Sequence, residues 1–387
     1  MRDQMQGKTA IYLVLFLMSL ILHIQFPIFT PYAVALGATS FFVSIMMSSS
    51  SLTNLGGHIL AGPMIDRIGK KPFIVLPLLL ASFSMMGHAL VANTEQLLLL
   101  RIFNGFVLAF MSPACFALLS AYAKNQRQQG KNMAINGLAV TAANIISPLL
   151  GGRLVQMLDY RGTYWLIGAA LFGTSLIALF YIKEAEPIVS HQKEQISFGA
   201  MLVNRQLLPI YFVGFALMYG NGTLFFELPF LTVEHGLNTA ETGKLFSLMG
   251  IGTLFSLSLF WLNRFSAFIR TAIALLLTGL LHYQMAAQVL PMNMTAVLVG
   301  MGMAFGLLFP ALTTLLTEKV GREQLGSAFG ILSAVFSLGG ITSAITAGAV
   351  RGIMSPYFLA FLVTMSGAIV IGLDYFKIKQ TIPVSKS

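Results

Sequence analysis

The chain has 387 residues, of which 56% are hydrophobic and only 9% are charged. Soluble domains carry about 25% charged residues, so this composition excludes an ordinary soluble enzyme and a disordered protein. The formal net charge is +10. It does not indicate nucleic-acid binding, because the basic residues lie in short loops between apolar blocks. Cys115 is the only cysteine, which excludes an intrachain disulfide and a cysteine-based metal site.

The apolar residues come in blocks of about 20, the length that crosses the hydrocarbon core of a bilayer as a helix. The first block is too long for the core of a signal peptide, and no small-residue cleavage pattern follows it, so we expect a retained span. Only Asn93 to Gln96 separates the third block from the fourth. The sequence predicts an all-α membrane protein with twelve transmembrane helices. The predicted spans are residues 10–30, 40–61, 73–92, 96–122, 133–157, 163–182, 207–231, 240–262, 268–288, 292–317, 326–350 and 355–376.

The basic residues predict the orientation of the chain. With both termini in the cytoplasm, all but five of the 23 Lys and Arg residues fall in cytoplasmic segments, as the positive-inside rule requires. Short loops and the lack of a targeting extension favour the cytoplasmic membrane of a bacterium as the location. The five exceptions are Arg101, Arg153, Arg161, Lys244 and Arg351.

The chain divides into two related halves. The longest polar stretch, residues 183–206, predicts a cytoplasmic linker between two bundles at 1–182 and 207–387. Pro113 in the fourth span and Pro310 in the tenth lie about 197 residues apart, and other short matches recur at nearly the same offset. The halves are therefore predicted to be two pseudo-symmetric six-helix bundles, related as parallel repeats.

The loop after the second span carries the most specific motif in the chain. Gly62 and Gly69 permit a tight turn and close helix approach. Asp66 can accept hydrogen bonds from a helix end or a basic group. Arg67 and Lys70 hold the loop on the anionic cytoplasmic face. This spacing of glycine, aspartate and basic residues resembles the loop signature of the major facilitator superfamily.

The resemblance covers the layout of the whole chain and is strongest to the 12-span bacterial exporters that exchange drugs or metabolites for protons. It implies the major facilitator fold. It also implies that the loop residues form a cytoplasmic gate that stabilises the outward-facing state. The alternative is that the positive charges only set topology.

The fourth span begins with Arg101 and continues to Asn104 and Gly105. This run resembles the R-x-x-Q-G element of the superfamily, with asparagine in place of glutamine. An arginine inside a span is a functional candidate by default, and the resemblance implies a part in proton transfer. The alternative is that Arg101 lies near the outer interface and extends to the headgroups.

The fifth span carries Pro148, Gly151 and Gly152. It resembles the end of the antiporter signature of the superfamily, although Ala143 and Ser147 stand where that signature has glycine. The resemblance favours export by antiport. The alternative is ordinary packing through a small-residue helix face with a proline kink.

If the superfamily layout holds, the first, fourth, seventh and tenth spans line a central cavity. The polar residues of these spans are then candidates for binding substrate. These substrate-cavity candidates are Gln25, Asn104, Tyr219 and Asn221.

Glu227 lies inside a predicted span, away from its cytoplasmic end. A desolvated carboxylate can load and release a proton near neutral pH, so we group Glu227 with Arg101 and His23 as candidates for proton coupling. Helical rise also allows Glu227 to be a solvated residue at the outer interface. His23 titrates near physiological pH, but a lone histidine on an apolar helix more often makes one structural hydrogen bond.

No phosphate-binding loop, metalloprotease helix or nucleophile signature occurs, so we expect neither ATP-driven transport nor an enzyme. No cofactor or metal site is predicted. The sequence predicts a monomeric secondary transporter that exports small amphipathic molecules, either drug-like compounds or a secreted metabolite such as a metallophore, in exchange for protons by alternating access. The alternatives are a proton-coupled importer, for example of sugars or organic acids, and a non-transporting membrane receptor.

Overall fold

The structure is a computed structural model that describes residues 2–122, 126–184, 203–287, 293–320 and 325–381. Within these ranges the chain is helical apart from turns and short connections, and no strand occurs. The predicted fold class is therefore confirmed. The helices are α1 (Arg2–Ile24), α2 (Phe29–Ala35), α3 (Ser40–Ile68), α4 (Pro72–Leu90), α5 (Thr94–Leu108), α6 (Met111–Ala121), α7 (Gln126–Tyr181), α9 (Leu208–Glu234), α10 (Thr239–Ser258), the 3-10 helix η1 (Phe260–Arg264), α11 (Ala267–Ala287), α12 (Met294–Lys319), α13 (Leu325–Val350) and α14 (Pro356–Thr381).

These helices account for the predicted spans. In the described residues, eight helices are long and apolar enough to cross a membrane, or nine if α1 and α2, which are bent by 40°, form one broken span. One of the eight, Ile135–Tyr181 within α7, covers both the fifth and the sixth predicted span. The remaining two, α3 and α10, coincide with the second and eighth predicted spans but are more polar. In α3 the polarity comes from the four serines Ser48 to Ser51.

Two predicted spans are interrupted in the structure. After α1 ends, the Phe26 amide donates to the His23 carbonyl at 3.2 Å, and Pro27 in this turn has no amide hydrogen to continue the helix. The fourth span is divided into α5 and α6. Pro113, in the first turn of α6, cannot donate to the Ala109 carbonyl, which favours the break at that point.

The fifth and sixth spans are joined at Asp159 within α7, where the backbone turns sharply with φ 59°. The Asp159 side chain accepts a hydrogen bond from the Gly162 amide at 2.7 Å. This contact satisfies an amide at the start of the following helix, as an N-cap residue does. A short polar residue is one of the few that tolerate this left-handed conformation.

The chain clusters into two compact units. The N-terminal unit comprises Met1–Ser190 with Leu228–Ser247, and the C-terminal unit comprises His191–Glu227 with Leu248–Ser387. The division thus passes through α9 and α10. Most of the predicted linker lies in residues 185–202, outside the described residues, so the domain boundary at 183–206 stays a prediction.

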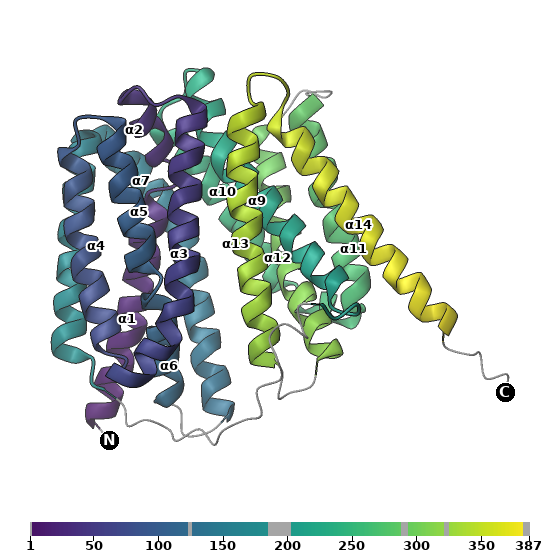
Figure 1. Cartoon of the computed structure of the whole chain (residues 1–387), viewed down its shortest axis with the longest axis horizontal. Coiled ribbons are helices and arrows are strands. Elements are labelled where there is room, and N and C mark those ends of the chain that lie inside the picture. Colours follow the sequence, from purple (N-terminus) through teal and green to yellow (C-terminus); the bar gives the residue numbers. More distant parts are fainter. Residues whose placement is uncertain (1, 123–125, 185–202, 288–292, 321–324, 382–387) are drawn as a thin grey trace. The chain divides into compact units, whose positions relative to one another are not determined.

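Each unit has its own helix packing. In the N-terminal unit α7 packs along α1 and α4, and α5 packs against both α3 and α4; α3, α4 and α5 run side by side (Figure 1). In the C-terminal unit α11 packs against α12 and α14, over a buried core that includes Leu308, Leu312 and Ile331. Large apolar side chains such as Leu99 and Leu280 are exposed, as expected for helices that face lipid.

Candidate transport site

A buried ion pair lies in the C-terminal unit. Glu227 is in α9, and its Oε2 atom is 3.0 Å from Nη1 of Arg351, which directly follows α13. Glu227 is only 4% exposed. It is therefore not the solvated end residue that the sequence left open as an alternative. The separation of such a pair would leave an uncompensated charge in a medium of low dielectric constant, which is strongly unfavourable.

An aromatic and an imidazole side chain extend this site. The Tyr357 ring lies 6.3 Å from the His282 ring, centroid to centroid, and both side chains are buried. The Tyr357 hydroxyl has no hydrogen-bond partner among the described residues, and it lies within electrostatic range of Glu227 and Arg351. The site therefore brings together a buried carboxylate, its arginine partner, a tyrosine and a histidine.

His282 also connects two helices. Its Nδ1 atom is 2.8 Å from the carbonyl oxygen of Thr278, one turn earlier in α11. Its Nε2 atom is 3.2 Å from the carbonyl oxygen of Gly220 in α9. A Cβ atom at Gly220 would lie 3.0 Å from the imidazole ring, so the close approach of the two helices depends on glycine at this position.

The N-terminal unit holds a cation among its own helices. Nη1 of Arg101 in α5 donates to Oε1 of Gln25 at 3.2 Å, and the guanidinium carbon lies 4.1 Å from the centroid of the Phe29 ring. The second contact is a cation–π interaction. No carboxylate of the described residues forms an ion pair with Arg101. The structure thus joins two of the predicted site residues, Arg101 and Gln25, but leaves their role a prediction.

A second histidine–tyrosine pair lies in the N-terminal unit. The His88 ring stacks on the Tyr164 ring at 5.0 Å between centroids, and His88 Nδ1 is 2.7 Å from the Ser84 carbonyl oxygen. His88 and His282 are about 194 residues apart, so the two pairs occupy corresponding places in the predicted repeats. Among the described residues, His88 Nε2 and the Tyr164 hydroxyl have no hydrogen-bond partner.

The other predicted site residues are distributed over both units. His23 Nδ1 is 2.5 Å from the Ser19 carbonyl oxygen, which is the structural hydrogen bond that the sequence offered as its alternative role. Asn104 is buried, with its amide nitrogen 3.9 Å from the Met85 sulfur.

In the C-terminal unit, the Tyr219 hydroxyl lies 2.6 Å from the Thr346 hydroxyl, and Asn221 is half-buried. Gln25 and Asn104 belong to one unit, and Tyr219 and Asn221 to the other. A substrate cavity that they share therefore stays a prediction.

The cytoplasmic loop is organised by a carboxylate that the motif does not contain. Gly69 ends α3 with φ 110°, a conformation that favours glycine. The Glu184 carboxylate accepts hydrogen bonds from the backbone amides of Lys70, at 3.0 and 3.1 Å, and of Lys71, at 2.7 Å. It thereby caps the start of α4, where negative charge is favourable. Arg67 is exposed.

Of Gly62 and Asp66, two of the predicted gate residues, the structure describes only the helical backbone. The predicted cytoplasmic gate therefore stays a prediction.

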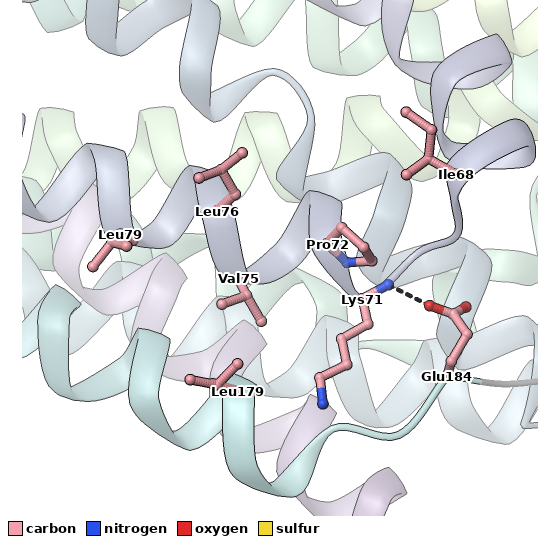
Figure 2. Close-up of a pocket in the computed structure, with 8 residues that line it drawn as sticks. All are labelled: Ile68, Lys71, Pro72, Val75, Leu76, Leu79, Leu179 and Glu184. Atoms are coloured by element: carbon pink, nitrogen blue, oxygen red, sulfur yellow. Dashed lines mark hydrogen bonds between the residues drawn. The ribbon is translucent and has the colours of Figure 1, made fainter.

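A cavity of about 420 Å³ lies beside the capped loop. Figure 2 shows that apolar side chains of α4 and α7 form most of its wall, with Glu184 bonded to the Lys71 amide at one end. The cavity does not include Glu227 or Arg101, so it is separate from both charged clusters. Its lining residues are Ile68, Lys71, Pro72, Val75, Leu76, Leu79, Leu179 and Glu184.

The antiporter-like helix makes close backbone contacts within the N-terminal unit. A Cβ atom at Gly151 would collide with the Ile24 carbonyl oxygen of α1, and one at Gly152 would lie 2.5 Å from the Thr239 carbonyl oxygen. A Cβ atom at Gly243 of α10 would collide with the Pro148 carbonyl oxygen. The small residues are thus needed for packing, which was the alternative role for this motif. Whether the motif also marks antiport is untested.

The fold and the buried charges within apolar helices define a polytopic membrane transport protein. The family model described as "Major Facilitator Superfamily" matches residues 11–375. The chain belongs to this superfamily, and it is a transporter rather than an enzyme. The resemblance that the sequence motifs indicated is therefore confirmed.

Named relatives and solved structures agree with this assignment. The chain is 28% identical to Multidrug resistance protein 1 of Bacillus subtilis (strain 168) over 322 residues, which cover 79% of each chain. It is 22% identical to Quinolone resistance protein NorA of Staphylococcus aureus (strain COL) over 378 residues, covering 93% of this chain and 94% of the relative. A crystal structure of a mutant of the nucleoside transporter NupG matches with a TM-score of 0.78 and 15% identity, over 96% of this chain and 99% of that one.

Sequence reasoning missed three parts of the site. Arg351 was visible as one of five basic residues outside the cytoplasmic segments, and its position after an apolar block was a usable signal. Glu184 was visible as an acid directly after the sixth span. The contact between His282 and Gly220 had no local signal, because it joins two helices that are distant in the sequence.

Proposed function

We propose that this transporter exports small amphipathic, drug-like molecules in exchange for protons. The multidrug and quinolone resistance proteins among its relatives, at 28% and 22% identity, support this substrate class. A secreted metabolite of similar chemistry, such as a metallophore, is a substrate of the same kind. In this proposal the chain acts as a monomer in the bacterial cytoplasmic membrane, with both termini in the cytoplasm.

The observation that carries the proposal is the buried pair of Glu227 and Arg351. A buried carboxylate inside a helix can lose or gain a charge near neutral pH. Here it is 4% exposed, and its partner is an arginine that stays charged. A change of conformation that separates the pair would leave the carboxylate to be neutralised by a proton, because an isolated buried charge is strongly unfavourable.

Alternating access then supplies the coupling. When Glu227 carries a proton, its carboxyl group is neutral and does not attract a cationic substrate. When the proton leaves, the negatively charged carboxylate attracts the substrate. Proton entry from outside and substrate binding from inside therefore compete for the same negative charge. The competition makes inward proton flow drive outward substrate flow, as the rocking of two bundles around a midplane site requires.

Arg101 has a complementary role in this proposal. Its positive charge is held by Gln25 and the Phe29 ring, and in this proposal it is the second group that carries or senses the proton. His23 is a lesser candidate, because its ring is already bonded to the helix backbone. The residues Gly62, Asp66, Arg67, Gly69 and Lys70 would control the cytoplasmic gate, and Gln25, Asn104, Tyr219 and Asn221 would contact the substrate.

The test is transport in proteoliposomes with an imposed pH gradient and a lipophilic cation, tetraphenylphosphonium, as the probe. We expect the wild-type protein to move the cation against its gradient when the opposite side is acidic. Glu227→Gln should lower gradient-driven transport at least about tenfold, since a neutral amide can neither bind nor release the proton. Arg101→Ala should weaken the response in the same assay.

Glu95→Gln is the matched control, because Glu95 is an exposed acid in the first turn of α5. It should transport like the wild-type protein. If the Glu227→Gln and Arg101→Ala proteins still follow the pH gradient as the wild-type protein does, the assignment of proton coupling is wrong. Net uptake of the probe in the same direction as the protons would instead identify an importer.

A further inference from the structure

The buried ring of His282 faces two groups that can only accept hydrogen bonds. A carbonyl oxygen has no hydrogen to donate, and the ring nitrogens point at the carbonyls of Thr278 and Gly220, at 2.8 and 3.2 Å. A neutral imidazole carries hydrogen on one nitrogen only. Both contacts are therefore hydrogen bonds only when the ring is doubly protonated and positively charged.

Two opposing effects act on this charge. Burial of the ring, at 1% exposure, disfavours the charged form. The two bonds favour it, since bonds from a charged donor are roughly twice as strong as neutral ones. A site in which these effects oppose each other can gain and lose a proton as its surroundings change.

We propose that His282 is a second proton-binding residue of this transporter. With the proton bound, the ring ties the Gly220 carbonyl of α9 to α11; without it, one of the two links is lost. The inference rests on the proposed function, because it adds a proton site to a proton-driven exporter.

The position of Gly220 shows why this link bears on transport. Gly220 lies seven residues before Glu227, about two turns along α9. Gly220 and Gly222 flank Asn221, and two glycines weaken a helix at this point. Release of the Gly220 carbonyl would therefore free the segment of α9 that carries Glu227. Proton loss at His282 and separation of the Glu227–Arg351 pair would then be parts of one movement.

The other titratable groups around the ring are few. On α14, Tyr357 lies 6.3 Å away between centroids. On α9, Tyr219 precedes Gly220, and Glu227 follows it by seven residues. Arg351 follows α13 and is paired with Glu227. Residues 294–317 of α12 contain no charged side chain. Glu227, which is paired with Arg351, is the carboxylate of α9 that lies nearest to Gly220 in the sequence.

His88 provides a built-in comparison. It occupies the corresponding place in the N-terminal unit and also stacks near a tyrosine, yet a carbonyl faces only its Nδ1 atom. Its Nε2 atom has no partner among the described residues. A neutral His88 ring, with its one hydrogen on Nδ1, can make this hydrogen bond, so His88 does not need a second proton.

The experiment is a proton titration of the full-length protein in lipid nanodiscs, together with nitrogen NMR of protein labelled at its histidines. We expect the His282 ring to be doubly protonated at pH 6 and to become neutral by pH 9, and the His88 ring to stay neutral throughout. The resonance is assigned by its absence in His282→Gln. Proton uptake between pH 9 and pH 6 should fall by about one proton per protein in this variant and stay unchanged in His88→Gln.

If His282→Gln does not fold, His282→Asn serves instead, because its amide can still donate to Thr278. A His282 ring that stays neutral, or that stays charged, over the whole range from pH 6 to pH 9 overturns the inference. This readout does not involve transport. Failure of proton-driven efflux with a titrating His282 would count against the proposed function, and the converse result would count against the inference alone.

Discussion

The role of a single side chain in this protein depends on its tertiary contacts. Glu227 alone could be a solvated end residue or a buried acid, and only the contact with Arg351 and the 4% exposure distinguish the two. The sequence singled out Glu227 and Arg101 as unusual charges inside apolar blocks. It could not predict their partners, because Arg351 lies 124 positions from Glu227 and Gln25 lies 76 positions from Arg101.

We predict that the side chains of Glu227 and Arg351 are energetically coupled. Arg351→Ala should lower the free energy of unfolding by about 3–5 kcal/mol, since it leaves the Glu227 carboxylate buried without its counter-charge. In the double variant Arg351→Ala with Glu227→Gln, the loss should be clearly smaller than the sum of the two single losses. Unfolding in denaturing detergent, followed by circular dichroism, measures all three.

Arg153→Ala is the matched control, because Arg153 is an exposed arginine outside the predicted cytoplasmic segments. Its effect should stay within about 0.5 kcal/mol. Strict additivity of the two substitutions at the pair would show that Glu227 and Arg351 do not interact in the membrane.

Whole helices were predicted better than their ends and breaks. Apolar blocks of the correct length sufficed for the spans, because lipid requires that backbone hydrogen bonds be made within the helix. The break between α5 and α6 and the joining of two spans at Asp159 were not predicted. A proline such as Pro113 can either kink or break a helix, so the sequence alone does not predict the break. The joining depends on a single left-handed residue whose side chain caps the helix that follows.

Close helix pairs recur in the two units. In the N-terminal unit, Gly105 of α5 packs against α3, where a Cβ atom would lie 2.5 Å from the Thr53 hydroxyl oxygen. That hydroxyl donates to the Ile102 carbonyl at 2.9 Å. In the C-terminal unit, the Thr253 hydroxyl of α10 donates to the Gly302 carbonyl of α12 at 3.1 Å. The same device, a threonine of one helix bonded to the backbone at or near a glycine of the next, holds both pairs together.

The close contact of Gly105 with α3 can be tested by substitution. Gly105→Ala should lower the free energy of unfolding by about 1–3 kcal/mol, because the added methyl group meets the Ser50 carbonyl of α3. Gly56→Ala is the control in the facing helix, since a Cβ atom there meets nothing within 4 Å. It should be neutral, or stabilising by up to about 1 kcal/mol, as alanine favours the helix. Equal losses in both variants would contradict the role of close packing.

At the scale of the whole molecule, the sequence indicated the two-fold repeat, but it did not indicate which side chains pair within each half. Proline positions in the fourth and tenth spans indicated related halves. The structure adds paired features that recur, such as His88 with Tyr164 and His282 with Tyr357. The units differ in how their arginines are paired. Arg101 of the N-terminal unit has no ion-pair partner among the described residues, whereas Arg351 of the C-terminal unit is paired with Glu227. In the proposed function, this difference assigns proton binding to the C-terminal unit, where the buried acid lies.

The orientation of the molecule in the membrane is predicted from the basic residues alone, and it can be tested directly. The wild-type chain suits cysteine labelling, since Cys115 is buried and should not react with a membrane-impermeant maleimide. A cysteine at Glu95, before the fourth span, should be labelled in intact cells, and one at Arg264, after the eighth, should not. Both positions are exposed, so burial cannot account for a difference between them.

Everted membrane vesicles should reverse the result: the cysteine at Arg264 should be labelled and the one at Glu95 protected. The physical reason is that basic loops are retained on the cytoplasmic side during insertion. Arg205→Cys should behave like Arg264→Cys. Arg205 precedes the seventh predicted span and Arg264 follows the eighth, so both are predicted to lie on the cytoplasmic side. If Glu95 and Arg264 react from the same side, an odd number of crossings cannot lie between them. The twelve-span topology, and with it the direction proposed for proton entry at Glu227, would then have to be abandoned.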